Sequence, residues 1–160
     1  MKSLFAAVMI LGLASLTLCA QKIVGGKSRE EKKSLEVATL EFKDMLQYGH
    51  LELADKVMAP DYIQHNPNVP GGREGFKQLM SRNRTAEPIQ KEWKRTPTLI
   101  IVAGPYVMFI TDVKAKDPAD PTKEYTRDHF DVVRVEKGMI AEHWDEARKS
   151  PPPAAGNRTQ

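Results

Sequence analysis

The sequence predicts an α+β domain in which three N-terminal helices pack on one face of a curved antiparallel sheet. Up to residue 83, apolar residues recur at steps of three and four, which is the helical period. From residue 98 onward, runs rich in β-branched and aromatic residues alternate with Gly, Pro and Asp turns. Helices followed by strands are typical of α+β folds, and 160 residues suit one domain.

The first twenty residues are typical of a secretory signal. Lys2 supplies a positive start, residues 4–18 form an apolar stretch, and Ala20 is a small residue at a cleavage point. The stretch is shorter than the roughly 20 apolar residues of a membrane span, which argues against an uncleaved anchor helix. Cys19 offers lipid attachment as an alternative, but Leu18 stands where a lipoprotein signal has a small residue. We therefore expect export, periplasmic or secreted, after cleavage of residues 1–20.

Three helices are expected after a linker at residues 21–29. The first begins near residue 30 and stops at Gly49. Its apolar stripe consists of Leu35, Ala38, Phe42, Met45 and Leu46. A short second helix over residues 51–59 ends at Pro60, and a third covers residues 71–83.

Four strands follow the helices. They are expected at residues 98–102, 106–113, 125–135 and 139–147. Strands that follow one another through short turns pair in antiparallel fashion, so the helices have one sheet face to cover. The domain then spans residues 30–147, and the proline-rich tail at residues 148–160 is expected to be disordered.

The segment DYIQHNPNVP, between the second and third helices, concentrates side chains that exchange hydrogen bonds or protons. His65 is a candidate proton-transfer group, and Tyr62, Gln64 and Asn66 are candidates for binding a substrate oxygen. The alternative is that Gln64 and Asn66 fix the loop by hydrogen bonds to backbone groups, and for Asn66 we favour this structural interpretation. The same structural interpretation is open for His65, which could fill a semi-polar corner.

The last two strands form a hairpin that turns at Lys137 and Gly138. Regular register predicts the pairs Val135–Ile140, Val133–Glu142 and Asp131–Trp144. One face then carries His129, Asp131, Val133, Val135, Ile140, Glu142 and Trp144. Two carboxylates in a pocket would raise one another's pKa toward the working pH. The alternative is that Asp131 and Glu142 are solvated charges at the rim.

The motifs YIQHNP and GREGF, together with the final DVVRVEKGMIAEHWD hairpin, resemble the SnoaL-like polyketide cyclase family of the nuclear transport factor 2-like superfamily. The resemblance covers residues 30–147. It implies a cone-shaped fold whose pocket lies between the sheet and the helices. It also implies aldol-type cyclisation by acid–base side chains with no metal or organic cofactor, and homodimers that pair through the outer sheet face.

The resemblance places the family's catalytic aspartate on Asp145 and its assisting histidine on the position of Asp131. Regular alternation puts these two on opposite faces, so a β-bulge near His143 or Trp144 is required. With the bulge, the expected catalytic residues are Asp145, Asp131 and His65. The expected pocket lining is Tyr62, Gln64, His129, Glu142 and Trp144. Without the bulge, Glu142 and Asp131 form the pair.

Two classes of partner are excluded by composition and spacing. A formal charge of +3 with interleaved acids and bases does not make the basic surface that nucleic acids require. Metal binding is not expected, because regular register puts His129 and His143 on opposite faces and no metal-ligand motif occurs. The sequence predicts an exported acid–base enzyme acting on a small apolar carbonyl compound. A non-catalytic module that binds a hydrophobic ligand is the alternative.

Overall fold

The computed structural model describes residues 21–147 and 149. The predicted signal segment and, apart from residue 149, the predicted tail lie outside the described residues. No helix in the described part of the chain is both long enough and apolar enough to cross a bilayer.

The N-terminal half forms helices with irregular hydrogen bonding. Helix α1 (Arg29–Thr39) starts at Ser28, whose hydroxyl and Glu31 form a capping box. It runs directly into the π-helix η1 (Leu40–Gln47), so the predicted first helix is confirmed. The predicted second helix is shorter than expected: it consists of η2 (Leu51–Leu53) and α2 (Ala54–Val57). Helix α3 (Arg73–Met80) is the predicted third helix.

The four predicted strands are all present, with two more at the edges of the sheet. The predicted strands are β3 (Leu99–Ala103), β4 (Tyr106–Lys116), β5 (Glu124–Glu136) and β6 (Met139–Asp145). The additional strands are β1 (Lys22–Val24), inside the expected linker, and β2 (Met58–Gln64). Strand β2 begins before Pro60, where a helix end was expected, because an edge strand tolerates a proline.

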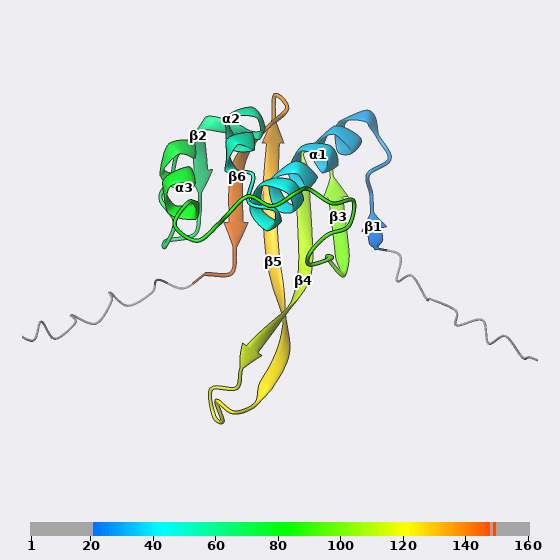
Figure 1. Ribbon diagram of the computed structural model, residues 1–160. Helices are drawn as coiled ribbons and strands as arrows, with labels where there is room; N and C mark the ends of the chain where they lie inside the picture. The colour runs from blue at the N-terminus through cyan, green and yellow to red at the C-terminus, as the bar shows by residue number, and fades with distance from the viewer. Residues whose placement is uncertain (1–20, 148, 150–160) are drawn as a thin grey trace, which may run out of the picture.

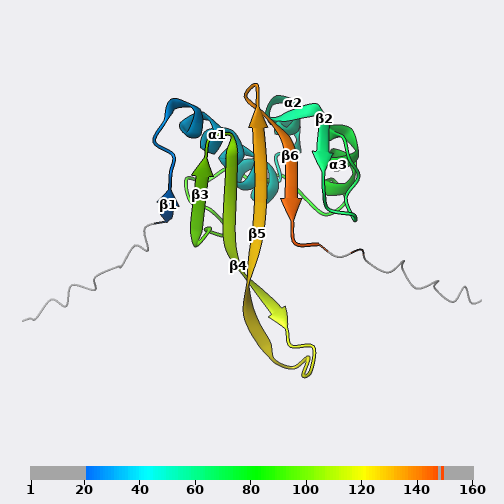
Figure 2. The ribbon, with the colours of Figure 1, turned by 180° about the vertical axis from the view of Figure 1, so that it is seen from behind.

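The sheet order is β1-β3-β4-β5-β6-β2, antiparallel in the middle and parallel where β1 and β2 join the edges. Helix α1 crosses one face of the sheet, and α2 and α3 lie beside β2 (Figure 1). Seen from behind, the opposite face carries no helix from the described residues (Figure 2). The α+β class with helices on one face of a curved sheet is confirmed.

The core lies between this helical layer and the sheet. Phe42 of η1 packs on Phe109 of β4, with 4.6 Å between ring centroids. The buried side chains of β4 and β5 alternate along each strand, as in Val107 and Phe109 or Val133 and Val135. Odd-numbered residues of these strands therefore face the helices, and even-numbered residues face outward.

Strand β6 breaks the expected register at Ala141. Val135 pairs with Ile140 as predicted, but Arg134 pairs with Glu142, which leaves Ala141 as the extra residue of a bulge. The predicted Val133–Glu142 and Asp131–Trp144 pairs are wrong. Val133 pairs with His143, and Asp131 pairs with Asp145. The bulge that the resemblance required exists, but it lies closer to the hairpin turn than His143 or Trp144.

Candidate active site

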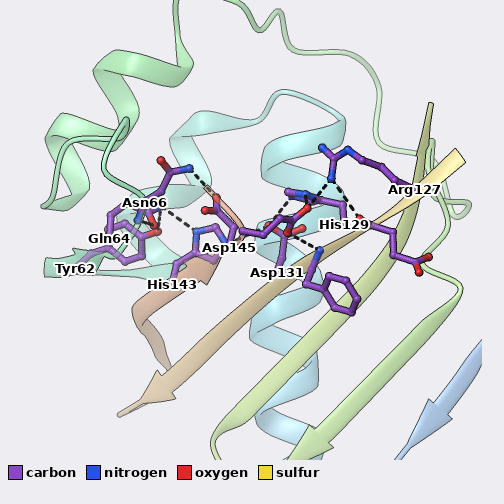
Figure 3. A network of polar contacts seen from close by, with 11 residues as sticks. Tyr62, Gln64, Asn66, Arg127, His129, Asp131, His143 and Asp145 are labelled. Atoms are coloured by element: carbon purple, nitrogen blue, oxygen red, sulfur yellow. Dashed lines mark hydrogen bonds and ion pairs between the residues drawn. The ribbon is translucent and has the colours of Figure 1, made fainter. Parts of the chain in front are cut away.

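A cluster of polar side chains lies on the helix-facing side of the sheet. It draws on four elements, because the bulge in β6 turns ionisable residues of that strand toward those of β5. The members are Glu41 from η1, Tyr62 and Gln64 from β2 with Asn66 just after it, His129 and Asp131 from β5, and His143 and Asp145 from β6. Figure 3 shows most of these side chains converging between β2 and β5.

Asp131 stands between two imidazole rings. Its Oδ1 lies 3.3 Å from Nε2 of His129 and 3.2 Å from Nε2 of His143. Burial opposes ionisation of this carboxyl, but the hydrogen bonds from both histidines outweigh burial and hold the pKa of Asp131 below its ordinary value. Asp131 is thus a carboxylate at neutral pH.

His129 is held in its charged form. Besides Asp131, its Nδ1 meets Oε1 of Glu146 at 2.6 Å, and Arg127 binds the same oxygen at 2.7 Å. The hydrogen bond to Asp131, reinforced by Glu146 against the effect of burial, raises the pKa of His129 to about 9. An imidazolium with this pKa carries a proton at neutral pH and can donate it or a strong hydrogen bond.

His143 is fixed from its other side by β2. Nε2 of Gln64 lies 2.9 Å from Nδ1 of His143 and donates to the hydroxyl of Tyr62 at 2.9 Å. With this amide orientation, Nδ1 accepts from Gln64 and Nε2–H donates to Asp131. Burial lowers the pKa of His143, yet Asp131 and the nearby Glu41 shift it to a net value above the ordinary one.

Asp145 has one occupied and one unoccupied oxygen. Nδ2 of Asn66 donates to its Oδ2 at 2.9 Å, whereas Oδ1 is buried and has no hydrogen-bond partner among the described residues. Asn66 is itself held, because its backbone N–H donates to Oε1 of Gln64. The side chain of Asn66 thus takes part in the cluster, in addition to the loop-fixing role predicted for it.

Glu41 is the most deeply buried acid of the cluster. Its residue is 1% exposed, and its Oε2 has no hydrogen-bond partner in the described structure. Burial, partly offset by His143, raises the pKa of Glu41 to about 7. The group lies in the π-helix, a form that often marks functional sites.

A cavity of about 170 Å³ gives access to one end of this cluster. Its lining consists of Phe42, Leu46, Gln47, Arg84, Arg95, Thr111, His129 and Asp131. A larger cavity of about 570 Å³ shares Leu46, Gln47, Arg84 and Arg95 with it. Among the predicted site residues, Asp131 and His129 line the smaller cavity, whereas Tyr62, Gln64 and Asp145 lie behind them in the hydrogen-bonded cluster.

Three predicted site residues lie on the other face of the sheet. The ring of His65 stacks on Trp144 with 4.6 Å between centroids, and its Nε2 lies 3.0 Å from Glu142. Glu142 also binds Arg134 at 2.6 Å. The expectation that the segment carrying His65 folds over the ionisable end of the pocket is wrong, because β2 continues the sheet and alternation turns His65 outward.

The cluster contains one group of possible metal ligands. Ligand atoms of Asp131, His143 and Asp145 lie within 4.8 Å of one another. The premise that His129 and His143 face opposite sides is wrong, since both bind Asp131. Both ring nitrogens of His143 already have hydrogen-bond partners, so a cation at this point would have to displace one of them.

Sequence reasoning missed Glu41, His143 and the arginines of the cavity. Glu41 had a signal, because it follows Ala38 by three residues and precedes Met45 by four on the buried stripe of the helix. His143 had none, because only the bulge turns it inward. Arg84 and Arg95 lie in irregular chain between α3 and β3, where periodicity gives no orientation.

Comparison with known proteins supports the family resemblance. A family model described as a SnoaL-like domain matches residues 40–143. No curated protein matches the chain.

Solved structures of low sequence identity share the fold. A proposed polyketide cyclase from Bacillus cereus ATCC 10987 is 18% identical, with a TM-score of 0.54 over 79% of this chain and 82% of that one. A proposed ketosteroid isomerase from Kribbella flavida DSM 17836 is 16% identical, with a TM-score of 0.52 over 82% and 90%. A LEH-like epoxide hydrolase from M. tuberculosis is 16% identical, with a TM-score of 0.51 over 72% and 83%.

Proposed function

This chain belongs to the SnoaL-like domain family, and from that premise we propose that it is an enzyme that transfers protons on a small carbonyl compound. The observation that carries the proposal is the cavity in which a carboxylate, Asp131, and an imidazolium, His129, stand side by side. Known structures with this fold are named as a cyclase, an isomerase and an epoxide hydrolase, so the fold by itself selects no reaction.

The two side chains have complementary roles in enolisation. Asp131 accepts a proton from the carbon next to the carbonyl, and the electron pair of that C–H bond moves to the carbonyl oxygen. As Asp131 takes up the proton and loses its charge, the Nε2–H of the His129 imidazolium, 3.3 Å from Asp131, turns to the enolate oxygen and stabilises it by a charged hydrogen bond, while Nδ1–H stays with Glu146. In a substrate with a double bond conjugated to the enolate, Asp131 returns the proton to the far carbon of the conjugated system, which gives isomerisation. Alternatively, the enolate carbon attacks a second carbonyl, whose oxygen takes the proton from Asp131 and completes aldol ring closure.

Asp145 is the second carboxylate of the proposed site. It pairs with Asp131 across β5 and β6, and its unoccupied Oδ1 is a possible proton acceptor. We assign the substrate-contacting role to Asp131, because that residue lines the cavity. Asp145 then keeps the cluster in order and supplies negative charge beside Asp131. The family resemblance assigns the leading role to Asp145, and substitution of each aspartate separates the two assignments.

Hydrogen–deuterium exchange tests the proposal without knowledge of the natural substrate. We expect the protein to accelerate exchange of the methyl protons of 4-acetylbenzamide in D₂O, measured by ¹H NMR. The control is the Asp131→Asn variant, which should show only the background rate. Binding of this and a panel of other methyl ketones without any exchange would refute the enzyme and favour the non-catalytic ligand-binding module.

Three further expectations accompany the proposed function. Exchange should persist in EDTA, because the proposed steps use side chains alone. The protein should be exported after removal of residues 1–20, which N-terminal sequencing of the secreted chain would check.

The protein should also form homodimers through the outer face of the sheet, where Tyr106 and Phe130 are more than 40% exposed. Light scattering showing only monomers at micromolar concentration would contradict the dimer.

A further inference from the structure

Two arginines line the same cavity as the proposed reacting groups. Arg84 and Arg95 border both the 170 Å³ cavity that contains Asp131 and His129 and the 570 Å³ cavity beside it. A molecule that fills the smaller cavity therefore lies against Asp131, His129 and both arginines at the same time. The mechanism proposed above uses neither arginine.

Neither guanidinium has a carboxylate within ion-pair distance among the described residues. Arg73, Arg127 and Arg134 each form ion pairs with acids. The exposed Arg29 and Arg82 have no ion pair among the described residues either, so what distinguishes Arg84 and Arg95 is their position at the cavity. Burial, followed by the charge of Arg95, lowers the pKa of Arg84 below its ordinary value. Two neighbouring cations without an anion repel each other, and a bound anion would remove this repulsion.

The protein holds both arginines in place by contacts that leave donors free. Nε of Arg84 donates to the carbonyl of Leu46 at 3.0 Å, and one terminal nitrogen contacts the sulfur of Met80 at 2.8 Å. The second terminal nitrogen of Arg84 has no hydrogen-bond partner within the described structure. The side-chain amide of Gln47 bonds the backbone N–H and carbonyl of Arg95, each at 3.0 Å. These bonds fix the backbone of Arg95, and its guanidinium has no hydrogen-bond partner within the described part of the chain.

The segment that carries Arg84 is also fixed to the end of η1. Gly49 has a φ of +81°, and a Cβ at that position would lie 2.4 Å from the carbonyl oxygen of Thr85. The backbone N–H of Glu87 donates to the carbonyl of Tyr48 at 2.9 Å. Glu87 lines the larger cavity, but its carboxylate is paired with Lys94 at 2.6 Å. The acid of the larger cavity is therefore paired with a lysine, and Arg84 lies on an anchored segment.

We propose that Arg84 and Arg95 form a subsite for a carboxylate group, so that the substrate of the proposed enzyme is a carbonyl compound that also carries a carboxylate. This inference rests on the proposed function for its carbonyl part, and on the two arginines for its anionic part. A planar carboxylate matches the guanidinium fork, which binds it through two parallel hydrogen bonds. It differs from the purely apolar ligand that the sequence predicts.

Two isosteric probes test the subsite by equilibrium binding. 4-Acetylbenzoate and 4-acetylbenzamide share the ketone and the ring, and differ in the negative charge. We expect isothermal titration calorimetry to give the carboxylate about tenfold higher affinity than the amide. Equal affinities for the two probes, or no binding of the carboxylate at millimolar concentration, would overturn the subsite.

Single substitutions assign that preference to the two arginines. Arg95→Gln and Arg84→Gln should each reduce the preference for the carboxylate by roughly threefold to tenfold. Arg82→Gln removes the same charge from an exposed position two residues from Arg84, and should leave the preference unchanged. An equal loss in Arg82→Gln would show a diffuse charge effect and overturn the subsite. Arg84 also donates a hydrogen bond to the carbonyl of Leu46, so Arg84→Gln could unfold the protein. In that case the affinities of Arg95→Gln for the two probes test the subsite.

The outcomes separate this inference from the proposed function. Methyl-proton exchange of the amide with no preference for the carboxylate refutes the subsite and leaves proton transfer standing. A carboxylate preference that disappears in Arg95→Gln, without exchange of either probe, refutes proton transfer and leaves the subsite standing.

Discussion

The two faces of the sheet carry similar ionisable groups in very different surroundings. On the helix-facing side, His143 contacts Asp131 and the histidine side chain is 8% exposed. On the outer side, His65 contacts Glu142 and the histidine side chain is 39% exposed. The first pair joins β6 to β5 at 3.2 Å, and the second joins β6 to the residue that follows β2 at 3.0 Å.

This contrast between the two faces indicates that a candidate active site is distinguished by the burial and the shared hydrogen-bond partners of its residues, and not by residue type. Asp131 receives hydrogen bonds from two histidines, and cavity space lies next to it. Glu142 is shared between His65 and Arg134, and a surface pair of this kind contributes little free energy because water screens it. The sequence alone made both sets look equivalent.

The largest expected effect on the helix-facing side is that of Asp131→Asn. An amide keeps the shape of the carboxylate but cannot accept the proton, so methyl-proton exchange should fall by about 10²- to 10⁴-fold. NMR exchange rates measure the loss, and circular dichroism confirms that the fold is intact. Asp128→Asn, at an exposed position of the same strand, is the matched control. Unchanged exchange in Asp131→Asn would refute the proposed role of this carboxylate.

Glu41→Gln tests burial itself through the pH dependence of stability. Because the pKa of Glu41 is raised from 4.5 to about 7, the folded protein holds this proton more tightly than the unfolded chain. Stability should therefore fall as the pH rises from 4.5 through 7, by about 3 kcal/mol for this one group. Urea unfolding at pH 5 and pH 8 should show that Glu41→Gln loses this dependence. Glu36→Gln, exposed on the same helix, should keep it.

Asp145→Asn should reduce exchange by about tenfold, less than Asp131→Asn. The amide can still face Asn66, but it removes the negative charge beside Asp131 and His143. Exchange rates of the two variants at the same pH make the comparison. A greater loss in Asp145→Asn than in Asp131→Asn would transfer the leading role to Asp145, as the family resemblance implies.

The smallest effect is expected on the outer face, where His65→Gln should change the exchange rate by less than about twofold. The His65→Gln variant should lose about 1 kcal/mol or less of folding stability, because the stacking on Trp144 and the pair with Glu142 are partly solvated.

His129→Gln is the matched substitution on the helix-facing side, and it should lower the methyl-proton exchange rate by about a hundredfold. Equal losses in the two variants would remove the functional distinction between the faces.

The sequence was sufficient to predict those helices and strands that bury one face against the core, because burial of one face sets the period of their apolar residues. The stripe through Ala38, Phe42 and Met45 and the alternation in β4 and β5 come directly from burial against the core. The edge strands β1 and β2 were missed because each is held by partners distant in sequence, at β3 and β6. Local propensity carries no information about such a partner.

The site was predicted only as far as the register was known. Asp131 and His129 lie on the face that alternation in β5 assigns to them, and the resemblance requires Asp145 to join them. Glu142 and Trp144 were assigned to the wrong face because one inserted residue reverses every side chain that follows it. The helix-facing position of Glu41 was readable from its spacing, but an acid on an apolar stripe has no visible partner in the sequence.

The bulge at Ala141 means that chain length and side-chain direction are not coupled in β6 in the usual way. If Ala141 were deleted, Ile140 would still pair with Val135 and Glu142 with Arg134, so His143 and Asp145 would keep facing the helices. If Ala141 stayed and itself paired with Arg134, every later residue of β6 would turn to the other face, and the two surfaces of the strand would exchange chemistry without any substitution. A lineage could therefore shorten this strand by one residue and keep its arrangement of acids and histidines, whereas a sequence of unchanged length could lose the arrangement through its pairing alone.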